Sequence, residues 1–97
     1  MTTYQARSGV LLTSVCNEYI LVAARSLKDV CPYVTVLNET SAFLWKQLKD
    51  RCSVDMLLKA VSETYQTDDP EEDKEAIEAF IKDMKELGYL EEHEQDA

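Results

Sequence analysis

A chain of 97 residues is long enough for one domain and too short for two. Its composition, 45% hydrophobic and 30% charged, is that of a globular domain and excludes a chain too polar to fold. The net charge of −9 is unevenly placed, because residues 1–66 carry seven basic and six acidic side chains whereas residues 67–97 carry three basic and thirteen acidic ones. The last third is therefore unsuited to binding phosphates.

Targeting and metal-binding signals are missing from the sequence. No apolar run reaches the roughly 18 residues that cross a bilayer, and residues 1–7 lack the basic start and apolar stretch of a signal peptide. We therefore expect a cytoplasmic protein without a membrane partner. Cys16, Cys31 and Cys52 are far apart and have no histidine nearby, so we expect reduced thiols and no metal site.

Three strands are predicted first, from β-branched and aliphatic residues without helical periodicity. Residues 9–13 and 19–24 are separated by a short turn at 14–18, in which Asn17 can adopt a positive φ, and this indicates a hairpin. After a polar loop, residues 33–37 form the third strand. Three short consecutive strands most simply make an antiparallel sheet. The length of the loop leaves the register of the third strand open by a residue or two.

Two helices are predicted next from capping residues and apolar spacing. A helix over 39–49 follows Asn38, whose side chain can accept a hydrogen bond from the first helical turn. A second helix opens at Ser53 and reaches Tyr65, with apolar residues at i, i+3, i+4 and i+7. Both helices should bury one face.

The third helix has the clearest boundaries. Asp69 caps it, Pro70 occupies the first helical position, and Gly88 can end it in the left-handed conformation. Residues 89–90 are expected to fold back onto the core. The apolar face of this helix consists of Ile77, Phe80, Ile81, Met84 and Leu87.

The predicted fold class is α+β, with a three-stranded antiparallel sheet followed by three helices, similar to a winged helix-turn-helix. We expect one folded domain over residues 9–90. Residues 1–8 should be a flexible N-terminus, and residues 91–97 a disordered acidic tail, because neither segment offers enough apolar side chains to hold it.

No catalytic constellation stands out. The only histidine, His93, lies in the expected tail, where no rigid neighbour could hold it against a nucleophile or a metal. Glycine occurs only at positions 9 and 88, so a glycine-rich phosphate loop cannot be built. We therefore expect a protein that is not an enzyme and that holds no cofactor.

A winged helix-turn-helix would also suggest nucleic-acid binding. The third helix argues against it, because it carries seven acidic side chains against three lysines. Phosphate contacts need positive charge, so this helix would repel DNA. We expect no nucleic-acid partner.

A series of short motifs resembles the PqqD family. The stretch 33–45 has a strand ending in Leu37-Asn38, then a small residue, then an aliphatic–Trp pair on the first helix. A helix opened by Ser53, an acidic linker with Asp-Pro-Glu-Glu and a final Leu-Gly-Tyr-Leu at 87–90 follow in order. The resemblance covers about residues 8–90. Each motif is short, and their order and spacing carry the likeness.

The resemblance implies a function in natural product biosynthesis. Members of the family are recognition elements, or peptide chaperones, for ribosomally made and post-translationally modified peptides (RiPPs). They bind the leader segment of a precursor and deliver it to a modifying enzyme, often a radical SAM protein. The leader would add as a strand beside the third strand and lie in a groove against the third helix. The implied peptide-binding positions are Tyr33, Val34, Thr35, Val36, Leu37, Ile77, Phe80, Ile81 and Met84.

Two alternatives stay open at this point. The four apolar residues of the third helix could each belong to the core instead of the groove. The same fold could also serve as a protein–protein docking or regulatory scaffold without a peptide substrate, including a homodimer formed through its apolar sheet.

Overall fold

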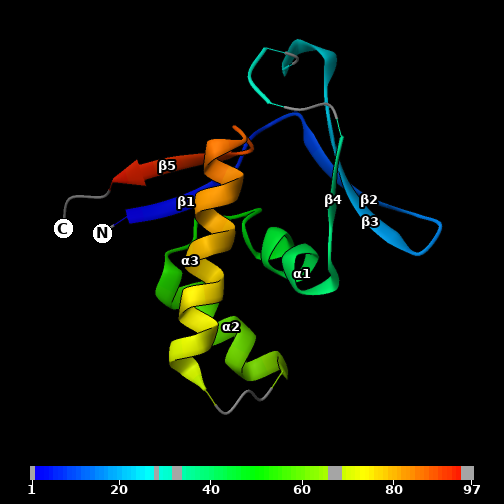
Figure 1. Cartoon of the computed structure of the whole chain (residues 1–97). Coiled ribbons are helices and arrows are strands. Elements are labelled where there is room, and N and C mark those ends of the chain that lie inside the picture. The colour runs from blue at the N-terminus through cyan, green and yellow to red at the C-terminus, as the bar shows by residue number, and fades with distance from the viewer. Residues whose placement is uncertain (1, 28, 32–33, 66–68, 95–97) are drawn as a thin grey trace.

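The computed structural model describes residues 2–27, 29–31, 34–65 and 69–94 (Figure 1). Within these ranges the chain forms two small antiparallel sheets, three α-helices and one short 3-10 helix. In chain order the elements are β1 (Thr2–Ala6), β2 (Val10–Val15), β3 (Glu18–Ala23), η1 (Arg25–Leu27), β4 (Val34–Leu37), α1 (Glu39–Gln47), α2 (Val54–Tyr65), α3 (Pro70–Glu86) and β5 (Leu90–Glu94). The predicted three-stranded sheet and three helices are confirmed. No helix in the described ranges has the length and apolarity to span a membrane.

The hairpin of β2 and β3 is tighter than predicted. Cys16 and Asn17 alone form the turn, with φ of 52° and 66°, so the strands pair as far as Val15 and Glu18. Two consecutive positive φ values define a type I′ turn, whose twist matches that of the strands it joins. The predicted turn at 14–18 was therefore too long, although Asn17 takes the predicted conformation.

The strand β4 lies at the edge of the sheet, in the order β2-β3-β4. Val34 pairs with Val22 and Leu37 with Tyr19, which settles the register that the sequence left open. Leu37 is buried on the face toward the helices, whereas Val36, one residue earlier, is 60% exposed on the outer face. The alternation is that of a strand with one covered face.

The three predicted helix caps are present. The side chains of Asn38, Ser53 and Asp69 each accept a hydrogen bond from the backbone N–H three residues later, at 2.7, 3.2 and 3.1 Å. Each cap satisfies one of the four backbone donors that a helix start leaves without an intrahelical partner. Local sequence therefore determines where these helices begin.

The structure of the two chain ends differs from the prediction. Instead of a flexible N-terminus and a disordered tail, residues 2–6 and 90–94 form the antiparallel strands β1 and β5, with Thr2 opposite Glu94. Figure 1 shows the two strands side by side. Tyr4 also exchanges two backbone hydrogen bonds with Cys52, at 2.8 and 2.9 Å, so β1 is held from both sides. Backbone pairing holds these segments where apolar side chains are few.

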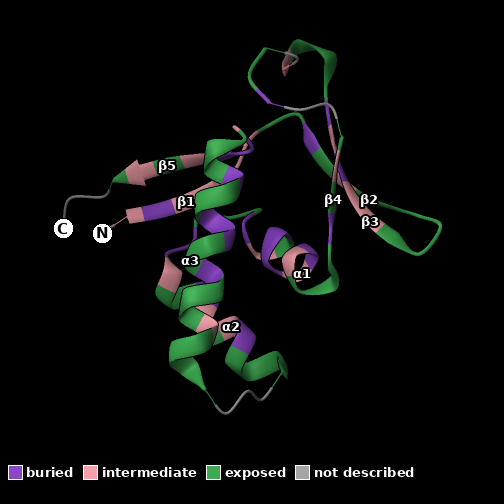
Figure 2. Ribbon diagram, viewed as in Figure 1, coloured by how far each residue is buried: buried purple, intermediate pink, exposed green. Residues whose placement is uncertain are grey.

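Tyr89 folds back onto the core, as predicted, and its side chain is fully buried. Its ring packs edge-on against Trp45 of α1, with ring centroids 6.2 Å apart. Its hydroxyl lies 2.6 Å from the Thr35 hydroxyl on β4. Burial raises the pKa of Tyr89, so its hydroxyl stays neutral, and either hydroxyl can donate the hydrogen bond to the other. Figure 2 shows the buried residues of α3 on the side toward α1.

Gly88 makes the reversal before Tyr89 possible. Its φ is +89°, and a Cβ at this position would collide with the backbone oxygen of Val30. Only glycine combines this conformation with this close approach at little cost. The predicted left-handed end of the third helix is confirmed.

The Tyr89–Thr35 contact can be tested by a double-mutant cycle. Tyr89→Phe keeps the ring and leaves the Thr35 hydroxyl without its Tyr89 partner, so it should lower the free energy of unfolding by about 1 to 2 kcal/mol. Thr35→Val in the Tyr89→Phe background removes the hydroxyl that has lost its partner. It should therefore lower the free energy of unfolding by less than Thr35→Val does in the otherwise unchanged chain. Urea unfolding of the four proteins measures this. Strictly additive effects would show that the two hydroxyls do not interact.

Candidate binding groove beside strand β4

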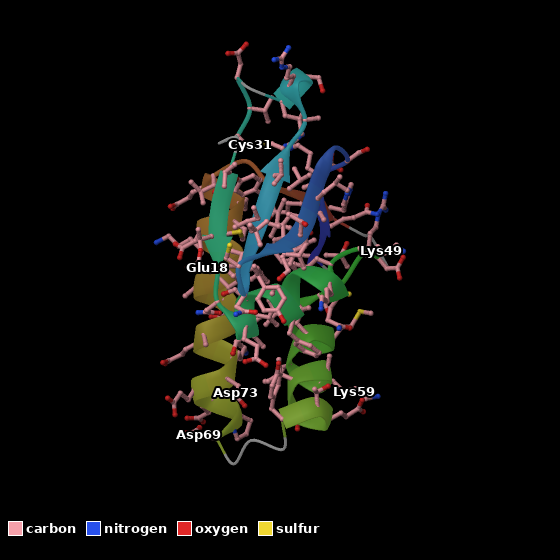
Figure 3. All side chains as sticks on the ribbon, turned by 90° about the vertical axis from the view of Figure 1, so that its right-hand side faces the viewer. Glu18, Cys31, Lys49, Lys59, Asp69 and Asp73 are labelled. Atoms are coloured by element: carbon pink, nitrogen blue, oxygen red, sulfur yellow. The ribbon has the colours of Figure 1, made fainter. Side chains whose placement is uncertain are left out.

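A groove of about 490 Å³ opens between β4, the start of α1 and the middle of α3. Figures 1 and 3 show β4 running alongside the C-terminal half of α3. Residues of the strand and of the helix form two walls of the groove. The lining consists of Val36, Leu37, Asn38, Thr40, Ser41, Leu44, Ala76, Ala79, Phe80, Asp83 and Met84.

The groove includes only some of the residues predicted on α3. Phe80 and Met84 line it, and their exposed fractions of 8% and 5% show that they also belong to the core. Ile77 and Ile81 do not line it. Ile77 is fully buried in the core, and Ile81 borders a different hollow together with Tyr4. Two of the four predicted α3 residues therefore line the groove, and two do not.

The predicted strand residues are divided in a similar way. Val36 and Leu37 line the groove, and Val34 and Thr35 lie farther along β4. Thr35 points its side chain toward Tyr89, on the covered face of the sheet. Tyr33 lies outside the described residues.

The hairpin turn determines which backbone groups of β3 face β4. A two-residue turn closes on a hydrogen-bonded pair, here Val15 and Glu18, and hydrogen-bonded pairs alternate along the ladder from there. The Ala24 N–H donates to the Gly9 carbonyl at 2.8 Å, as this alternation requires. The even-numbered residues of β3 therefore turn their backbone groups toward β2, and the odd-numbered residues turn theirs toward β4.

The same alternation leaves part of β4 open. Thr35 and Leu37 are opposite odd-numbered residues of β3, so their N–H and C=O groups bond to that strand. Val34 and Val36 must direct theirs to the other side. Among the described residues no further strand pairs with β4. Two N–H and two C=O groups are thus presented along an edge that borders the groove.

The groove has few groups that could carry out chemistry. Of its described lining residues only Asp83 is charged, and the other polar groups are the amide of Asn38 and the hydroxyls of Thr40 and Ser41. His93 lies on β5, outside the lining. In the described part of the chain no three His, Cys, Asp or Glu side chains are grouped to hold a metal. Apolar walls, an open strand edge and one carboxylate suit the binding of an extended segment.

Sequence reasoning missed the wall contributed by α1 and the two alanines of α3. Ala76 and Ala79 lie three residues apart, beside Phe80 and Asp83 on one flank of the helix. Small side chains there leave room that longer ones would fill. A pair of alanines flanking an apolar stripe was the available signal.

Three solved structures share this fold. One is described as lasso peptide synthetase B1 complexed with the leader peptide; it is 19% identical, with a TM-score of 0.70 over 91% of this chain and 96% of that chain. A second, TbiB1 in complex with the TbiA(beta) leader peptide, is 14% identical, with a TM-score of 0.71 over 95% of this chain and 99% of that one. At these identities the likeness establishes the fold alone.

The third solved structure shows the fold to a similar degree. It is the PqqD truncation of Methylobacterium extorquens PqqCD, described as a stand-alone RiPP recognition element; it is 19% identical, with a TM-score of 0.71 over 92% of this chain and 88% of that one. The winged helix-turn-helix remains a loose analogy beside this match. No curated protein matches the sequence closely. The family model for coenzyme PQQ synthesis protein D (PqqD) matches residues 18–90, which is most of the chain. The chain therefore belongs to the PqqD family.

Proposed function

We propose that this chain is a cytoplasmic recognition element, without catalytic activity of its own, that binds the leader segment of a ribosomally made precursor peptide. The leader adds as a strand to β4 and is delivered to a modifying enzyme, a radical SAM protein or a similar one. One observation carries the proposal: the open backbone edge at Val34 and Val36 borders an apolar groove. The leader-peptide complexes of the two structural neighbours support it.

Backbone pairing alone gives too little affinity. The edge offers a few hydrogen bonds, each worth about 0.5 to 1.5 kcal/mol net. Micromolar binding needs about 8 kcal/mol. Burying one large apolar side chain of the peptide adds about 1.5 to 3 kcal/mol. Side chains that enter the groove between Val36 and the Phe80–Met84 wall must therefore supply much of the affinity.

The edge is tested at Val36. Val36→Pro removes an N–H that faces the peptide and leaves the β3–β4 ladder intact, so we expect at least tenfold weaker binding in a folded protein. Val36→Ala, which keeps the N–H, should bind more tightly than the proline variant. Thr35→Pro should instead disrupt the ladder and the fold. Titration calorimetry with a precursor peptide encoded beside this chain's gene measures the affinity. Equal affinity of the proline and alanine variants would place the peptide elsewhere.

The groove wall is tested by two truncations on α3. Met84→Ala should weaken peptide binding by about 1 to 3 kcal/mol and also lower stability, because Met84 serves both groove and core. Ile77→Ala should lower stability by about 2 to 5 kcal/mol and leave the affinity of the folded protein unchanged. Thermal melting and calorimetry on both variants separate the two effects. If Met84→Ala also left affinity unchanged, the groove assignment would be wrong.

A second candidate function is self-association through the outer face of the three-stranded sheet. The described residues Leu11, Val15, Val34 and Val36 are exposed there by 70, 51, 46 and 60%. Leu11 and Val34 lie in one line across the sheet, because both are opposite Val22. Contiguous exposed apolar surface of this kind marks interaction sites in many proteins.

Self-association can be separated from peptide binding. If the outer face joins two copies, sedimentation velocity should show a dimer at high micromolar concentration, and Leu11→Lys should return it to a monomer. Peptide affinity should survive that substitution, because Leu11 is not part of the groove lining. A chain that stays monomeric at every concentration would eliminate this candidate.

A further inference from the structure

The wall of the groove formed by α3 carries one acidic side chain, Asp83. Asp83 lines the groove and is exposed to solvent. Glu72 and Glu86, eleven residues before it and three after, lie on the same flank of the helix by its 3.6-residue repeat, and both are exposed. None of the ion pairs among the described residues involves Asp83. Its carboxylate is therefore available to a ligand.

The lysines of α3 lie outside the groove lining. Lys74 borders a hollow with Thr2 and Tyr4, and Lys82 and Lys85 border one with Tyr4 and Val54. Neither hollow shares a residue with the groove.

One of these lysines already has a partner. The Lys85 ammonium lies 2.9 Å from a Glu92 carboxylate oxygen on β5, and this hydrogen bond raises the pKa of Lys85. The three lysines of α3 thus lie away from the groove, whereas Asp83 lines it.

The opposite wall supplies no compensating charge. Its described lining residues are all uncharged: Val36, Leu37, Asn38, Thr40, Ser41 and Leu44. Glu39, which lies between two of them in the sequence, is exposed and outside the lining. The groove is therefore bordered by apolar and neutral polar groups on one side and by a carboxylate on the other. A segment that carries acidic side chains along α3 would meet repulsion, and one that carries basic side chains would meet attraction.

We propose that the leader segment bound by this chain carries a lysine or arginine where it passes Asp83, flanked by apolar side chains that enter the groove. This inference rests on the proposed function and specifies its substrate class. In an extended segment alternate side chains point to the same side, so one basic residue can face α3 between apolar neighbours. Asp83 is exposed, and exposed ion pairs are weak, so the selectivity should be modest, about two- to fivefold in affinity.

The test is a selection from a display library of randomised peptides on the immobilised, full-length chain. It is run in parallel on the unchanged protein, on Asp83→Lys and on Glu63→Lys. Glu63 is exposed on α2 and lies outside the groove. Glu63→Lys changes the net charge of the protein by the same amount as Asp83→Lys, and therefore controls for net charge. Selected peptides are then measured individually against Val36→Pro, which identifies those that use the β4 edge.

Three outcomes are distinguishable. The inference is supported if peptides that need the β4 edge are enriched in Lys or Arg when they are selected on the unchanged protein and on Glu63→Lys, and if this enrichment is lost on Asp83→Lys. Edge-dependent peptides without basic enrichment, or with the same enrichment on Asp83→Lys, overturn it and leave the proposed function standing. If the selected peptides bind Val36→Pro as well as the unchanged protein, the edge does not bind peptides, and the proposed function fails together with the inference.

Discussion

The burial of Tyr89 is the contact on which the groove depends. Its ring rests on Trp45 of α1, its hydroxyl meets Thr35 of β4, and its backbone N–H donates to the Met84 carbonyl at 2.9 Å. Through its backbone and its side chain, Tyr89 therefore ties the end of α3 to the edge strand and to the first helix. The separation of β4 and α3 follows from this arrangement, and that separation is the width of the groove.

Helix α3 serves three neighbours at once. Ile77 is buried in the core, Phe80 and Met84 are shared between core and groove, and Lys85 reaches β5. A helix with a narrow apolar stripe could not do this, because each neighbour needs its own flank. The broad apolar face of α3 lets one helix contact the core, the groove and β5 at the same time.

The sequence predicted those parts of the fold whose signals are local. Capping side chains at Asn38 and Asp69 and the left-handed Gly88 specify where helices begin and end, because each acts within one helical turn. The pairing of β1 with β5 could not be foreseen, since it joins the two ends of the chain through backbone groups that every residue has. The groove lining could not be assigned in full either. Ile77 and Phe80 belong to the same apolar face of α3, and only the packing of the helix against β4 places Phe80 in the groove and Ile77 outside it.

An open strand edge attracts any unpaired strand, including that of an identical molecule, and is a common start of aggregation. Here β4 is only four residues long, and it runs beside a helix that carries seven acidic side chains against three lysines. Two molecules pairing β4 with β4 would bring two such helices together and would repel each other. The edge can therefore stay open to a foreign strand, because the net negative charge of α3 opposes the pairing of two copies through β4.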